Sequence, residues 1–76
     1  MEKVEVNVVE HIATIAEYRS GYDLELNLIS YNGYAPRYDL RRWDKMGNRM
    51  GKGITFTADE ADEIVRALKN HRRRVK

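Results

Sequence analysis

The chain has no cysteine and only two histidines among its 76 residues. The absence of cysteine excludes a disulfide and a thiolate metal site. His11 and His71 are too far apart in the sequence to suggest a shared metal site. A chain this short buries only about 60% of the surface that it exposes when unfolded, so its core is marginal. Without disulfides or metals, we expect the domain to gain stability from a partner subunit.

Long apolar segments are absent as well. No run of apolar residues approaches the length that spans a membrane, and the N-terminus does not read as an apolar signal segment. These two absences predict a cytoplasmic protein with no membrane partner.

The two signs of charge are segregated along the chain, although the net charge is only +2. Residues 1–36 carry two cations and six carboxylates, whereas residues 37–52 carry six cations and two carboxylates. The C-terminus is basic again, with three consecutive arginines at 72–74. Segregated positive charge of this kind indicates a polyanion partner better than the net charge does.

Period-2 alternation of apolar residues predicts four strands separated by turns. Asn32-Gly33 is a strong hairpin signal, and Pro36, which cannot donate to a central ladder, extends that turn into a loop. The stretch 44–53 contains three glycines and predicts a flexible loop. The predicted strands are 4–8, continuing after a bend at 9–11 as 12–18, then 22–31, 37–43 and 54–56.

A helix is expected after the last strand, because Thr57 and Glu60 form a capping box. One apolar stripe at helical spacing runs along 61–68, and the helix is expected to end near Asn70 or a little beyond, leaving 70–76 as a frayed basic tail. The sequence therefore predicts an α+β fold in a single domain, 1–76. Its architecture is a four-stranded antiparallel sheet followed by one C-terminal helix, assembled as a homodimer.

The strand 37–43 suggests what the sheet binds. Tyr38 and Leu40 share one parity and are the natural core side, which places Arg37, Arg41 and Trp43 on an open face. Cations and an aromatic ring on one open face suit phosphates and unstacked bases of a single-stranded nucleic acid. The alternative for Trp43 is a core position with its indole nitrogen paired. Both parities of 22–31 are partly apolar, so alternation alone does not decide which of its faces is buried.

Three segments in this order resemble the YdbC family, the bacterial branch of the transcriptional positive cofactor four superfamily of single-stranded nucleic-acid-binding proteins. The segments are V-V-E-H-I-A-T-I near the start, L-I-S-Y-N-G at 28–33, and M-G-K-G-I-T at 50–55 directly before the T-x-x-E helix start. The resemblance covers nearly the whole chain. It implies a homodimer of two such sheets, with the helices helping at the dimer interface and single-stranded DNA or RNA lying along the sheets with little sequence preference.

The resemblance and the residues together predict a set of nucleic-acid contacts. By position in the family segments, Arg41 and Lys52 resemble the cations that contact the backbone, and Trp43 lies at or next to an aromatic position. Tyr34 at the hairpin tip is a further candidate for stacking, and Tyr31 is either a stacking residue or half-buried packing. The complete predicted set is Arg37, Arg41, Arg42, Lys45, Lys52, Trp43, Tyr34 and Tyr31.

The sequence gives no support for catalysis. It has no nucleophile–base pair with distinctive spacing and no cofactor fingerprint, so we expect no enzyme, no catalytic residue, no metal, no cofactor and no small-molecule substrate. One alternative is a protein-interaction adaptor that docks an acidic partner, and another is a small metal-dependent nuclease. The cellular process and the choice between DNA and RNA stay open, because stacking on aromatic rings serves both nucleic acids.

Overall fold

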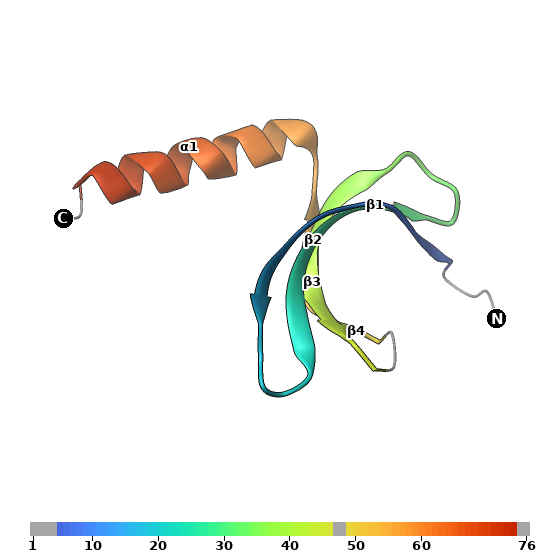
Figure 1. Cartoon of the computed structure of the whole chain (residues 1–76). Helices are drawn as coiled ribbons and strands as arrows, with labels where there is room; N and C mark the ends of the chain where they lie inside the picture. The colour runs from blue at the N-terminus through green and yellow to red at the C-terminus, as the bar shows by residue number, and fades with distance from the viewer. Residues whose placement is uncertain (1–4, 47–48, 75–76) are drawn as a thin grey trace.

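The computed structural model describes residues 5–46 and 49–74 and has the predicted order of four strands and one helix (Figure 1). All neighbouring strands pair antiparallel, in the order β1-β2-β3-β4. This confirms the predicted α+β class and the architecture of a single chain. The elements are β1 (Val6–Glu17), β2 (Tyr22–Tyr31), β3 (Arg37–Asp44), β4 (Met50–Phe56) and α1 (Ala58–Arg74).

Strand β1 is continuous where the sequence predicted a bend. Its pairing with β2 shifts at three places, between Val8 and Glu10, between His11 and Ala13, and between Thr14 and Ala16. Each shift is an irregularity of the bulge type, which bends a strand without ending it. The apparent bend at 9–11 is therefore the first of these irregularities, and the repeated bending follows the strong curvature of the sheet (Figure 1).

The turn between β2 and β3 has the backbone that its sequence requires. Asn32 and Gly33 both have positive φ, 51° and 78°, and the Tyr34 amide donates to the Tyr31 carbonyl over 2.9 Å. Positive φ at both central residues belongs to the type I′ turn, whose twist matches that of the flanking strands. The Asn-Gly prediction is confirmed.

Strand β4 begins at Met50, four residues earlier than the sequence predicted, so the predicted loop 44–53 is wrong over 50–53. The glycines suggested a loop, but Gly53 lies inside the strand, opposite Arg41. A Cβ atom at Gly53 would overlap the Arg41 Cβ and lie 2.5 Å from the Leu40 carbonyl oxygen. Glycine is therefore needed here for the close approach of two strands, a use that its local sequence does not distinguish from a turn.

Helix α1 starts at the predicted cap. The Thr57 amide donates to Glu60 Oε1 over 2.8 Å, and the Glu60 amide donates to Thr57 Oγ1 over 3.2 Å, which is a reciprocal capping box. The helix continues to Arg74, so the predicted frayed tail is wrong over 70–74. Figure 1 shows it on the convex side of the curved sheet, extending away from it. The predicted tail residues 75 and 76 lie outside the described residues.

The distribution of buried residues differs from the predicted core. Ile29 is the one buried apolar residue among those described, and α1 contributes none. The fully buried polar side chains Asn27 and Asp39 share the parity of Ile29 and Arg41 in the register of β2 and β3. The face of the sheet that the sequence predicted to be open, the face of Arg41, is therefore the more buried of the two faces in the single chain, because the sheet curves around it. Leu40 is only half-buried.

Candidate nucleic-acid interface

The concave face of the sheet carries the residues that the sequence placed on an open face. Residues that pair directly across neighbouring strands have side chains on the same face of the sheet. The pairs on the concave face include Val8 with Ile29, Glu25 with Arg41, and Trp43 with Met50. The face contains a groove of about 540 Å³, the concave groove. It is lined by Val6, Val8, Glu25, Trp43, Asp44, Lys45 and Met50.

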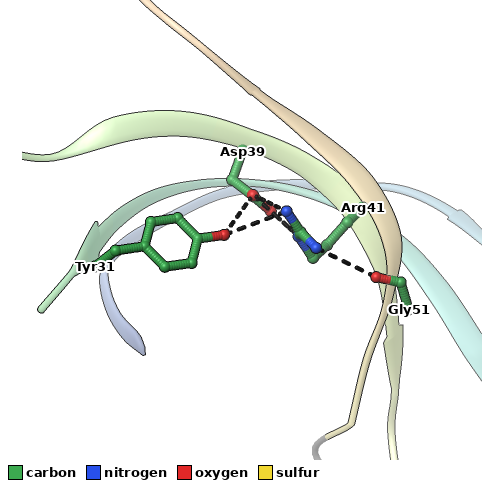
Figure 2. A network of polar contacts seen from close by, with 4 residues as sticks. All are labelled: Tyr31, Asp39, Arg41 and Gly51. Carbon is green, nitrogen blue, oxygen red and sulfur yellow. Dashed lines mark hydrogen bonds and ion pairs between the residues drawn. The ribbon is translucent and has the colours of Figure 1, made fainter. Parts of the chain in front are cut away.

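Arg41 lies on this face in a dense polar network (Figure 2). Its Nε donates to Asp39 Oδ1 over 2.7 Å, its Nη2 donates to Asp39 Oδ2 over 2.7 Å, and its Nη1 donates to the Gly51 carbonyl over 3.2 Å. The Tyr31 hydroxyl accepts from Arg41 Nη2 and donates to Asp39 Oδ2, each over 3.2 Å. The network ties the end of β2 and the middle of β3 to β4.

The network also determines the charge that Arg41 presents. Asp39 is fully buried and the Arg41 side chain is 14% exposed. Hydrogen bonding to Asp39 raises the pKa of Arg41 above its already high ordinary value, so Arg41 stays charged. Burial, followed by the charge of Asp39, raises the pKa of Tyr31. Because Asp39 opposes the charge of Arg41, and Asp39, Tyr31 and Gly51 together occupy most of its donors, Arg41 has little left to offer a phosphate in this arrangement.

A second polar cluster on the concave face was not anticipated from the sequence. Asn27 Oδ1 lies 2.6 Å from His11 Nδ1, and Asn27 Nδ2 donates to Glu25 Oε1 over 3.2 Å. Thr14 Oγ1 lies 3.2 Å from His11 Nε2. These residues meet because the irregularities in β1 turn both His11 and Thr14 to the concave side, which simple alternation along the strand does not predict.

The other predicted cations lie in different surroundings. Arg37, at the start of β3, and Lys52, in β4, are exposed. Lys45 Nζ lies 3.2 Å from Glu17 Oε1 and 3.4 Å from Asp23 Oδ1, and the hydrogen bond to Glu17 raises the pKa of Lys45.

Arg42 has the opposite parity to Arg41, and its guanidinium carbon lies 4.6 Å from the centre of the Tyr18 ring. Its parity thus sets Arg42 on the convex side of the sheet, where it makes a cation–π contact with Tyr18 and does not line the concave groove.

The three predicted aromatic residues are dispersed. Trp43 lines the concave groove, and its indole Nε1 is buried without a hydrogen-bond partner among the described residues. Tyr34 is 74% exposed at the hairpin tip, whereas Tyr31 is half-buried in the Arg41 network. Trp43 pairs with Asp23 at the start of β2 and Tyr34 follows the end of β2, so the two rings lie at opposite ends of the hairpin. The structure brings together Trp43 and Lys45 but leaves Tyr34 and Arg42 apart from them.

The convex face and the helix share an apolar surface. A cavity of about 300 Å³ between them is lined by Ile15, Leu24, Leu26, Tyr38, Leu40, Phe56, Ala61, Ile64 and Val65. The predicted helical stripe faces this cavity but stays largely open, with Val65 50% and Leu68 57% exposed. Tyr38 and Phe56 stack with ring centres 5.9 Å apart on the same face.

Two kinds of site are not found in the part of the chain that the structure describes. No group of three or more His, Asp or Glu side chains is arranged to hold a metal ion. No described helix has the length and apolar character needed to cross a membrane.

Comparison with known proteins gives one informative similarity. No protein-family model matches the chain. An uncharacterized protein of Treponema pallidum (strain Nichols) is 40% identical over 53 residues, which is 70% of this chain and 62% of that protein. The match thus spans less than two thirds of the relative's length. It carries no statement of activity, and the resemblance to the YdbC family stays a prediction.

Proposed function

We propose that this protein is a sequence-tolerant binder of single-stranded DNA or RNA that works as a homodimer. The observation that carries the proposal is the position of Trp43, the chain's one tryptophan, in the wall of an open groove on a curved sheet. A base stacked on an aromatic ring contributes about 1–3 kcal/mol, and stacking needs no particular base. Duplex DNA, whose bases are already stacked and paired, is expected to bind less well.

The charges around the groove suggest how a strand would lie. The groove itself holds the carboxylates Glu25 and Asp44, which repel phosphate. The exposed cations Arg37 and Lys52 are not among the residues that line it. We infer that bases enter the groove and that phosphates follow the cations outside it. Arg41 then acts mainly by holding β3 and β4 in place, and Lys45 contacts phosphate only if it leaves Glu17 and Asp23.

The apolar surface on the other side supports the homodimer. A chain with one buried apolar side chain in its described part has little of the core that a stable domain needs. Apolar groups on the convex face and the helix would be buried if a second copy packed there, at about 25 cal/mol for each Å² removed from water. We infer that the second copy covers this surface and leaves both concave grooves open to the strand.

Fluorescence anisotropy of labelled dT20 at two salt concentrations tests the binding. The proposal predicts affinity that falls steeply with salt, because each neutralised phosphate of a single strand contributes about 0.7 to the slope of log K against log salt. It also predicts quenching of Trp43 emission by the unlabelled strand. Absence of binding at low salt would refute the proposal and favour the alternative, an adaptor for an acidic protein.

A further inference from the structure

The concave groove contains a hydrogen-bond acceptor as well as an aromatic ring, on residues that are diagonal neighbours in the register of β2 and β3. Glu25 and Trp43 both line the groove, and the Glu25 side chain is 24% exposed. Glu25 Oε1 accepts from Asn27 Nδ2 over 3.2 Å, while Oε2 makes no hydrogen bond within residues 5–46 and 49–74. Glu25 is thus held from one side and has a free oxygen available to a ligand.

A carboxylate at this place restricts what can bind beside the ring. An ionised carboxylate only accepts hydrogen bonds and repels phosphate, so its partner must be a donor on a base edge. The N3–H of thymine or uracil lies between two carbonyl oxygens, which would face the carboxylate unfavourably. Adenine and cytosine each offer one amino group. Guanine offers N1–H and the N2 amino group side by side, which matches the two oxygens of a carboxylate.

We propose that the concave groove prefers guanine among the bases of a single strand, with Glu25 reading the guanine N1–H and N2 amino group while the base stacks on Trp43. This inference rests on the proposed function and adds a base preference to it. Asn27 acts as a positioning residue, because its amide fixes one oxygen of Glu25. The apolar groove residues Val6, Val8 and Met50 contribute contacts that accept any base.

The test compares dT20 with the same strand carrying isolated guanines between thymines, a spacing that avoids structures formed by guanine runs. A third strand carries inosine, which keeps N1–H and lacks the N2 amino group. Wild-type protein is expected to bind the guanine strand at least roughly fivefold more tightly than dT20, the lower end for a two-point base contact. The inosine strand is expected to lose most of that gain.

Two variants separate the contact that Glu25 makes with the base from the effect of the protein's net charge. Glu25→Gln keeps the shape of the side chain and is expected to abolish the difference in affinity between the guanine strand and dT20. Glu10→Gln changes the net charge equally but lies on β1 opposite Leu28, with the parity of the convex face, and is expected to keep the preference.

Equal binding of all three strands by the wild type would overturn the guanine inference and leave single-strand binding intact. A guanine preference that survives in Glu25→Gln would overturn the inference in the same way. Failure to bind any strand would refute the proposed function and this inference together. The strand comparison needs only the wild-type protein, so it decides the question even if a variant fails to fold.

Discussion

Replacing Asp39 with asparagine is expected to destabilise the fold by about 3–5 kcal/mol, because the substitution leaves a buried guanidinium without its counter-charge. Asp39 is fully buried, and Arg41 has two of its nitrogens bonded to it at 2.7 Å. The 14% exposure of the Arg41 side chain admits some water and favours the lower end of that range. Since a whole domain is stable by only about 5–15 kcal/mol, the loss is a large share of the total.

Urea unfolding followed by the fluorescence of Trp43 measures this loss directly. Glu63→Gln is the matched control: it removes one carboxylate from an exposed ion pair with Arg66, 3.3 Å apart on the helix. Such a pair contributes about 0–1 kcal/mol. The double variant Asp39→Asn with Arg41→Gln removes both charges and is expected to be more stable than Asp39→Asn alone. A loss for Asp39→Asn no larger than that for Glu63→Gln would refute the account of the network.

Three further predictions concern the strands, the tyrosine hydroxyl and the helix. Gly53→Ala is expected to lower the free energy of unfolding, measured in urea, by about 1–3 kcal/mol, because the added methyl group overlaps Arg41. Lys52→Ala on the same strand is expected to change it by no more than about 0.5 kcal/mol. Equal losses for the two variants would contradict the close approach of β3 and β4 at Gly53. Because the folded-state pKa of Tyr31 is raised, its contribution to stability is intact below pH about 10 and lost as the pH rises through the folded value. Lys45 and Arg41 also have raised pKa values, so part of the alkaline loss of stability does not depend on Tyr31. Tyr31→Phe is therefore expected to lessen, but not abolish, the fall in the free energy of unfolding between neutral and alkaline pH. An unchanged dependence of that free energy on pH would argue against the burial of the Tyr31 hydroxyl. Leu68→Glu, on the open helical stripe, is expected to shift the sedimentation mass from dimer to monomer, and a wild-type mass of one chain at micromolar concentration would contradict the homodimer.

Local signals in the sequence were sufficient for most of the fold. The Asn32-Gly33 turn and the Thr57 capping box depend on a few adjacent residues, and both appear as predicted. The number and order of strands followed from alternation and turns. A frayed tail was predicted over residues 70–74, which are helical, because a run of arginines is typical of a tail, although cations also suit the last turn of a helix.

The candidate site was less predictable, because it depends on contacts between strands. Alternation placed Arg41 correctly on the face of Trp43 but gave no sign that Asp39, two residues away, would neutralise it. The cluster of His11 with Asn27 depends on irregularities in β1 that no local signal marks. The curvature of the sheet also makes the face of Arg41 more buried than the opposite face, the reverse of what the sequence predicted. This curvature depends on all four strands together, so no local signal marks it.

The measurement that tests the central claim most directly is the affinity of Trp43→Ala for labelled dT20, compared with wild type at the same salt concentration. Removal of a stacking ring from the groove is expected to weaken binding by about 1–3 kcal/mol. Circular dichroism of the variant shows whether the sheet is retained, and Tyr34→Ala, at the far end of the hairpin, is the matched aromatic control. Strong binding by the wild type that is weakened selectively by Trp43→Ala would support the groove as the nucleic-acid site. Equal binding by the folded variant would contradict it.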